Sequence, residues 1–123
     1  MNKYRNKKVE FDGYIFDSIK EKNRYVELKM LQDRGYIKNL KIKPLYKLIP
    51  GNDKFRSIKY EADFSYDSEY GFRCEWEFIV EDVKPDYKNY TAERNYKKTA
   101  AYQMFLVKKK LMYHVHGIIV REV

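Results

Sequence analysis

Hydrophobic and polar residues alternate with a period of two over residues 58–66, which predicts a β-strand, and other short apolar runs along the chain indicate further strands. The dipeptide Asp12-Gly13 lies between two of these short runs and is typical of a hairpin turn. Pro44 cannot donate a ladder hydrogen bond, so the segment around it is expected to be interrupted or to lie on an edge. The predicted strands are a hairpin over 9–16, an extended segment over 36–49, and strands at 58–66, 72–84 and 118–123.

In two other parts of the chain apolar residues recur at helical spacing. The first runs over 18–34, where Ser18 and Glu21 have the spacing of a capping box and Gly35 offers a left-handed stop. The second runs over 96–115 and ends before a glycine. Its expected apolar stripe contains Ala101, Met104, Phe105, Leu111, Met112 and Val115.

The order of these elements is hairpin, helix, three strands, helix, strand. This order predicts an α+β or α/β fold with a central mixed β-sheet flanked by helices. The 123 residues suffice for one domain with a core of its own, and residues 1–8 are expected to form a flexible basic arm. The single cysteine, Cys74, cannot form an internal disulfide and is interpreted as a packed strand residue.

The charge of the chain narrows the function. Lysine and arginine number 26 against 18 acidic residues, a net charge of +8, which favours a polyanionic partner such as nucleic acid. A lysine-rich composition inherited from an AT-rich genome is the alternative explanation. The chain begins with charged residues instead of a signal peptide, and no apolar run reaches membrane-spanning length, so a soluble cytoplasmic protein is expected.

Two carboxylates and a lysine form the pattern that carries chemistry. Asp63 lies in the strand at 58–66, and Asp82 and Lys84 end the next strong strand. If the two strands are neighbours, Asp63 and Asp82 can hold Mg²⁺ or Mn²⁺, while Lys84 reaches a water or a phosphate. A short D…DxK pattern also occurs by chance at solvated strand ends. Asp63 lies on the polar side of its strand and Asp82 on the apolar side of its own, so a bulge, twist or two covered sheet faces must bring them together.

Longer segments raise the specificity of this pattern. Residues 16–21 with Arg24-Tyr25 and residues 27–29, the run Tyr60-Glu61-Ala62-Asp63-Phe64, and the run Val80-Glu81-Asp82-Val83-Lys84 follow one another along the chain. Together they resemble a phage and prophage nuclease family long described only as a domain of unknown function. That family looks like a branch of the PD-(D/E)xK superfamily, akin to archaeal-type Holliday-junction resolvases. Pro85 departs from the family pattern, where glycine follows the lysine, and the threonine region before the second helix is matched only loosely around Thr99.

The resemblance implies a restriction-endonuclease-like core and a metal-dependent DNA endonuclease that acts on branched DNA, as a homodimer. It implies that Asp63, Asp82 and the Val83 carbonyl bind Mg²⁺ or Mn²⁺. Lys84 would be the catalytic lysine, and Glu21 would face the site from the first helix.

Each residue also has a simpler interpretation. A capping role explains Glu21 without any metal, and Glu81 is expected to be a surface or supporting carboxylate. His114 and His116 are interpreted as ordinary histidines. The predicted DNA contacts are Arg24, Lys108, Lys109 and Lys110, although Lys108 could equally be an aliphatic stem at the edge of the apolar stripe. The alternative function is a non-catalytic nucleic-acid-binding protein that uses the same basic surface.

Overall fold

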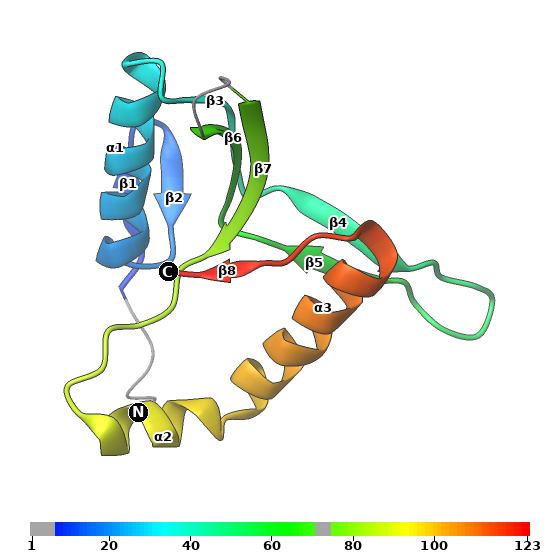
Figure 1. Ribbon diagram of the computed structural model, residues 1–123. Helices are drawn as coiled ribbons and strands as arrows, with labels where there is room; N and C mark the ends of the chain where they lie inside the picture. Colours follow the sequence, from blue (N-terminus) through cyan, green and yellow to red (C-terminus); the bar gives the residue numbers. More distant parts are fainter. Residues whose placement is uncertain (1–6, 71–74) are drawn as a thin grey trace.

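The computed structural model describes residues 7–70 and 75–123, which form helices and strands in an α+β arrangement (Figure 1). The predicted fold class is confirmed. In chain order the elements are β1 Val9–Phe11, β2 Tyr14–Phe16, α1 Ile19–Asp33, β3 Ile37–Ile42, β4 Leu45–Ile49, β5 Ile58–Glu61, β6 Phe64–Tyr70, β7 Glu75–Asp82, α2 Tyr90–Lys97, α3 Ala100–His116 and β8 Arg121–Glu122.

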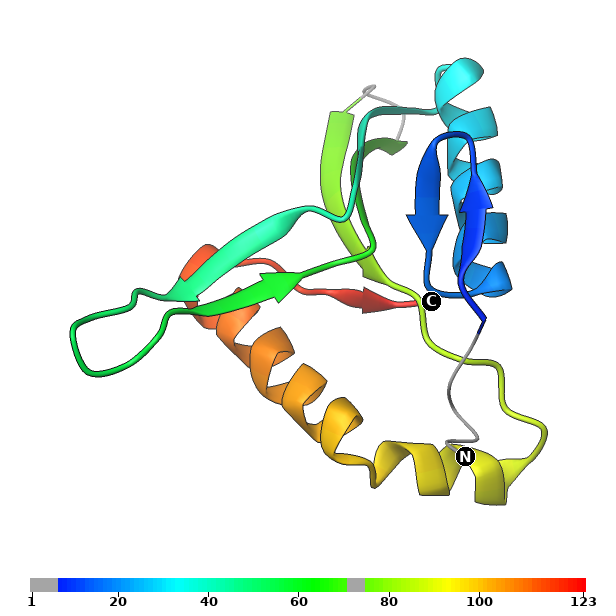
Figure 2. The ribbon, with the colours of Figure 1, turned by 180° about the vertical axis from the view of Figure 1, so that it is seen from behind.

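The central sheet has the strand order β3-β6-β7-β8. Its pairs are antiparallel except β7 with β8, which is parallel, so the sheet is mixed as predicted. Helix α1 and the β1–β2 hairpin lie on one side of this sheet, and α3 lies on the other side with the β4–β5 hairpin (Figures 1 and 2). Both faces of the sheet are therefore covered. This is one of the three arrangements, beside a bulge and a twist, that were expected to bring Asp63 and Asp82 together.

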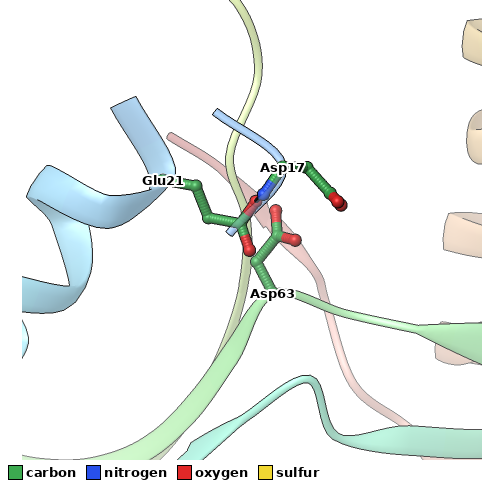
Figure 3. A group of neighbouring side chains, drawn as sticks. All are labelled: Asp17, Glu21 and Asp63. Atoms are coloured by element: carbon green, nitrogen blue, oxygen red, sulfur yellow. Dashed lines mark hydrogen bonds between the residues drawn. The ribbon is translucent and has the colours of Figure 1, made fainter. Parts of the chain in front are cut away.

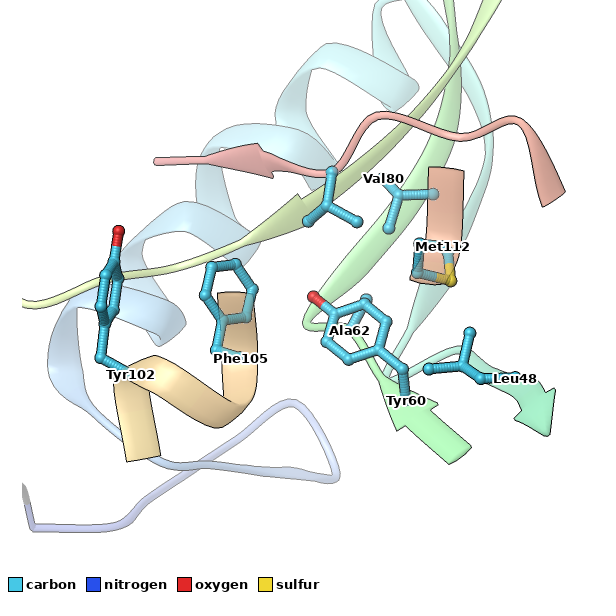
Figure 4. Close-up of a cluster of buried hydrophobic side chains, with 8 residues drawn as sticks. Leu48, Tyr60, Ala62, Val80, Tyr102, Phe105 and Met112 are labelled. Atoms are coloured by element: carbon cyan, nitrogen blue, oxygen red, sulfur yellow. The ribbon is translucent and has the colours of Figure 1, made fainter. Parts of the chain in front are cut away.

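Two hydrophobic clusters fill the spaces between these layers, because neighbouring residues of a strand point to opposite faces. Ile79 packs in the cluster under α1, and the next residue, Val80, packs in the cluster under α3. Figure 4 shows the second cluster, where α3 meets β4, β5 and β7. The buried members under α1 are Phe16, Tyr25, Leu28, Ile37, Phe64, Tyr66 and Ile79, and those under α3 are Leu48, Tyr60, Ala62, Val80, Tyr102, Phe105, Met112 and Val120.

The predicted strand at 58–66 is wrong in one respect, because the chain turns a corner at Ala62–Asp63 and passes from β5 into β6. The segment that pairs with β5 and β6 turns at the same level, where Lys43 adopts a φ of 54° and Pro44 lies between β3 and β4. Hydrogen bonds continue through the corner, from Lys43 N–H to the Asp63 carbonyl (2.9 Å) and from Ala62 N–H to the Pro44 carbonyl (3.0 Å). The apolar residues before the corner, Tyr60 and Ala62, pack under α3, and those after it, Phe64 and Tyr66, pack under α1, a change of side that the sequence pattern does not show.

The ends of the helices follow from their capping residues. Ser18 caps α1 by accepting a hydrogen bond from Glu21 N–H (3.1 Å), and Gly35 follows the helix with a φ of +84°, as predicted. The second helical region is corrected, because it begins at Tyr90 and divides into α2 and α3. Thr99 caps α3 by accepting from Tyr102 N–H (3.2 Å), so the chain restarts a helix there.

The face of α3 that packs against the sheet also differs from the expected stripe. Its buried residues are Tyr102, Phe105 and Met112, whereas Met104 and Val115 are exposed. The expectations for Cys74 and for most of the basic arm fall on residues outside the described ranges. In the described part of the chain, no helix combines the length and the apolar character needed to cross a bilayer.

Candidate active site

The corner between β5 and β6 places Asp63 beside the end of β7. In the β6–β7 ladder Phe64 pairs with Glu81, and Asp63 N–H donates to the Glu81 carbonyl (3.1 Å), so Asp63 and Asp82 are cross-strand neighbours. Beyond the strand, Val83 N–H donates to Asp63 Oδ2 (2.6 Å). This bond orients the Asp63 carboxylate toward the chain that carries Asp82 and Lys84. The carbonyl role predicted for Val83 stays a prediction; the contact observed is made by its N–H.

The first turn of α1 brings a second carboxylate to the same point. Glu21 is only 3% exposed, and its Oε2 accepts a hydrogen bond from Asp17 N–H (3.1 Å). This is a variation of the expected capping box, in which the glutamate would bind the N–H of the serine. The other oxygen, Oε1, is buried and has no hydrogen-bond partner in the described part of the chain. Figure 3 shows Glu21 directed from α1 toward Asp63.

Asp17 joins these two residues from the loop that precedes α1. One carboxylate oxygen from each of Asp17, Glu21 and Asp63 lies within 4.8 Å of the others (Figure 3). Oxygen atoms at such spacing can surround a hard divalent cation. Asp17 is exposed at the rim, and its carboxylate lies 4.0 Å from the ammonium groups of Lys8 and Lys43. Asp17 was not among the site residues predicted from the sequence.

The electrostatics of the cluster reflect buried negative charge. Burial raises the pKa of Asp63 to about 8, and the nearby charges of Asp82 and Glu21 add to the effect. Burial is also the main cause that raises the pKa of Glu21. Carboxyl groups that resist ionisation in this way occur often at functional sites. A bound cation would remove the penalty by compensating the charge.

Asp82 and Lys84 form an ion pair in the lining of the same site. Lys84 Nζ lies 3.0 Å from Asp82 Oδ1 and 3.3 Å from the centre of the Phe105 ring of α3. The second oxygen of Asp82 accepts a hydrogen bond from the Tyr60 hydroxyl (2.5 Å). Phe105 therefore supports the lysine by a cation–π contact, and Tyr60 fixes the carboxylate.

The segment after β7 is held on both sides. Lys84 N–H donates to the Val123 carbonyl (2.8 Å), and Lys20 Nζ donates to the Lys84 carbonyl (2.5 Å). Lys20 also pairs with Asp86 (3.0 Å). The result is a cavity of about 470 Å³ whose lining includes Glu21, Asp63, Asp82 and Lys84, the four predicted catalytic residues, together with Asp17. The carboxylates close enough to share an ion are those of Asp17, Glu21 and Asp63, and the metal-binding role predicted for Asp82 stays a prediction.

Glu81 has a different environment from the one expected. It is 1% exposed, points to the α1 side of the sheet, and pairs with Arg24 through Nε–Oε1 (2.9 Å) and Nη2–Oε2 (2.5 Å) contacts. The Tyr66 hydroxyl also donates to it. Glu81 is thus buried, so of the two expected roles the surface location is wrong, and the supporting role stays a prediction. Arg24 is engaged by this pair and by Glu27, and the DNA contact predicted for it stays a prediction.

The three lysines predicted as DNA contacts lie on α3. Lys109 pairs with Glu122 (2.8 Å), Lys108 is half-buried, and Lys110 is exposed. Their role in binding DNA stays a prediction. His116 contacts the Lys47 carbonyl (2.9 Å), and neither histidine belongs to the acidic cluster found among the described residues.

Three supporting residues escaped the sequence analysis: Asp17, Tyr60 and Phe105 in their roles at the site. Asp17 precedes the Ser18 cap directly, so its place beside the first turn of α1 was readable once the helix start was known. Tyr60 and Phe105 carry no such signal, because an aromatic residue on an apolar face indicates only core.

Comparison with known proteins gives one match. Residues 1–118 match the family described as "Protein of unknown function (DUF1064)". No curated protein and no solved structure matches the chain.

Proposed function

We propose that this chain, which belongs to the DUF1064 family of proteins of unknown function, is a metal-dependent DNA endonuclease of the PD-(D/E)xK type. One observation carries the proposal. Glu21, Asp63, Asp82 and Lys84 come from α1, the β5–β6 corner and the end of β7, and they line one cavity. Carboxylates beside an ammonium group suit phosphodiester hydrolysis.

The side chains fit a hard divalent cation such as Mg²⁺ or Mn²⁺. The donors are carboxylate oxygens, and the buried Oε1 of Glu21 lacks a partner among the described residues, a deficit that an ion would satisfy. Asp63 and Glu21 would hold the ion, with Asp82 on one side and Asp17 at the rim. When bound, the ion would polarise a water and a phosphate oxygen.

The residues of the chain perform the remaining tasks. The Lys84 ammonium group, held between Asp82 and the Phe105 ring, would stabilise negative charge on the phosphate during attack by water. The Tyr60 hydroxyl keeps the Asp82 carboxylate in its orientation, and the Val83 N–H does the same for Asp63. The Lys20 contacts to Lys84 and Asp86 fix the wall along which the substrate backbone would lie.

The proposed substrate is branched DNA such as a four-way junction, as the resemblance to junction resolvases implies. A junction requires two symmetric cuts, so a homodimer with a two-fold axis is the matching assembly. The net charge of +8 supports a nucleic-acid partner. Equal cleavage of linear duplexes and junctions by the purified protein would refute junction selectivity.

The experiment compares cleavage and binding of labelled junctions in Mg²⁺ for wild type, Asp82→Ala and Lys84→Met. We expect the wild type to cut, and both variants to bind DNA and lose cleavage by more than about 100-fold. Asp33→Asn removes an exposed carboxylate at the far end of α1 and serves as the control, with unchanged cleavage. If wild type binds junctions but cuts none with any divalent metal, the non-catalytic binding function replaces the nuclease.

A further inference from the structure

The β4–β5 hairpin projects from the body of the protein (Figure 2). Two lysines stand next to each other on its outer face. Lys47 pairs directly with Lys59 across the two strands, and both side chains are exposed. Like charges in directly opposed positions destabilise a sheet. In the described part of the chain no carboxylate forms an ion pair with these two lysines, or with Lys54 and Arg56 nearer the tip. A polyanion would compensate this arrangement.

The tip of the hairpin presents an aromatic ring in a defined position. Phe55 is 73% exposed, yet its backbone is fixed, because Asn52 Oδ1 accepts from the N–H groups of Lys54 and Phe55 (2.8 Å each). Asn52 N–H donates in turn to the Phe55 carbonyl (2.9 Å). The loop also closes tightly, since a Cβ at Gly51 would lie 2.9 Å from Ser57 N. The exposure of Phe55 is therefore a property of an ordered turn.

The base of the hairpin is attached firmly to the rest of the molecule. Its inner face buries Leu48 and Tyr60 under α3. His116 at the end of α3 contacts the Lys47 carbonyl (2.9 Å), and its ring lies 5.8 Å from that of Tyr46. The outer, basic face is thus held in a constant direction.

We propose that this hairpin is a DNA-binding arm. Its outer lysines bind the phosphate backbone of a duplex arm of the substrate, and Phe55 packs against a base pair exposed at the branch point. Phosphate contacts of this kind need only cationic side chains on an accessible face. Apolar wedges that contact unstacked base steps are known in other DNA-binding proteins. The proposal rests on DNA being the substrate, as proposed above.

The connection to the active site supports this assignment. The ladder of the hairpin continues through the corner, so the hairpin is joined directly to the segment that carries Asp63. The eight residues from Phe55 to Asp63 can span at most about 26 Å at roughly 3.3 Å per residue, because only Ile58–Glu61 of this segment are a strand. This length corresponds to about seven base pairs at 3.4 Å each. One DNA duplex can therefore reach both the tip and the carboxylates.

The first test separates the hairpin from charge in general. Binding of labelled duplex and junction is measured by fluorescence anisotropy without divalent metal, between about 50 and 200 mM NaCl. For Lys47→Ala/Lys59→Ala we expect the slope of log affinity against log salt to fall by about two. The control, Lys29→Ala/Arg34→Ala, removes the same charge from the far end of α1 and should leave the slope unchanged. Equal slopes for both double variants would overturn the arm.

The second test concerns the ring at the tip. Phe55→Ala should weaken junction binding about tenfold at every salt concentration without changing the slope, and should affect a linear duplex much less. Equal losses on both substrates would overturn the branch-point contact. Size-exclusion chromatography with light scattering is run on the same variants. If the hairpin variants are monomers where the wild type is a dimer, and the salt slope of DNA binding is unchanged, the hairpin binds a second copy of the chain. The DNA-binding arm is then refuted.

The outcomes distinguish this inference from the nuclease. If the wild type binds DNA with a salt slope that depends on the hairpin lysines but never cuts, the DNA-binding arm is supported and the nuclease proposal is refuted. If all hairpin variants cut junctions as well as the wild type does, the nuclease proposal is supported and the DNA-binding arm is refuted. Absence of any DNA binding removes the arm as well.

Discussion

Raising the pH should destabilise the metal-free protein, because Asp63 has to ionise inside a buried cluster. Burial, Asp82 and Glu21 raise the pKa of Asp63 to about 8 in the folded state. In the unfolded chain the pKa of an aspartate is about 3.9. Since the folded pKa is the higher one, the stability contributed by protonated Asp63 is complete below about pH 4. It is lost progressively as the pH rises toward 8.

The magnitude follows from proton linkage. Between those two pKa values the free energy of unfolding falls by about 1.4 kcal/mol for each pH unit. From pH 5 to pH 7 the loss from Asp63 is therefore about 3 kcal/mol, a substantial part of the total stability of a small domain. Asp63→Asn cannot ionise, so the free energy of unfolding of this variant should lack that decline. The stability difference between variant and wild type should therefore grow by about 3 kcal/mol over the same range.

Urea denaturation followed by circular dichroism in EDTA at pH 5, 6 and 7 measures this difference. Asp33→Asn, an exposed carboxylate variant, should follow the wild type. Addition of Mg²⁺ at pH 7 should restore stability to the wild type but not to Asp63→Asn, because a ligand that binds only the folded state stabilises it by mass action. If wild type and Asp63→Asn change in parallel between pH 5 and 7, Asp63 is not a high-pKa group and the account of the buried cluster is incorrect.

Further predictions concern the framework around the site, and each is measured by the same denaturation assay. Ser18→Ala removes the N-cap of α1 and should cost about 1 kcal/mol, whereas a change below a few tenths would show that the cap is dispensable. Gly117→Ala places a side chain at a φ of +69° and should cost about 1 kcal/mol; a neutral effect would contradict the left-handed cap of α3. Arg24→Met leaves the buried Glu81 carboxylate without its guanidinium and should cost about 3 kcal/mol, and the double variant with Glu81→Leu should recover most of that loss. Additive effects in this double-mutant cycle would show that the two residues are not coupled.

Much of the local structure could be predicted because it depends on neighbouring residues. The Asp12-Gly13 turn adopts positive φ at both positions, and Ser18 and Gly35 mark the two ends of α1. These signals act within a few residues of the chain, so they survive in any tertiary context.

The corner at Ala62–Asp63 could not be predicted from alternation. The buried residues Tyr60, Ala62, Phe64 and Tyr66 keep a period of two, so the pattern is that of one strand, although the first two pack under α3 and the last two under α1. The bend arises where Pro44 and Lys43 on the partner strand interrupt regular pairing, and the sequence does not state which residues will face them.

The candidate site was predicted in outline and incompletely in detail. Asp63, Asp82, Lys84 and Glu21 line one cavity, as their resemblance to the family motifs implies. The burial of Glu81 depends on Arg24, a partner 57 residues away in the sequence. The neighbouring carboxylates Glu81 and Asp82 therefore look alike in the sequence, although they lie in different environments. Likewise, the length of the second helical region depended on Thr99, which caps a new helix instead of continuing the old one.

The ladder that continues through the β5–β6 corner, together with the packing of Leu48 and Tyr60 under α3, joins the hairpin rigidly to the segment that carries Asp63. The direction of the hairpin tip is therefore set by the same residues that position the Asp63 carboxylate. A substitution that loosens this packing would alter the reach of Phe55 and the spacing of the carboxylate oxygens together.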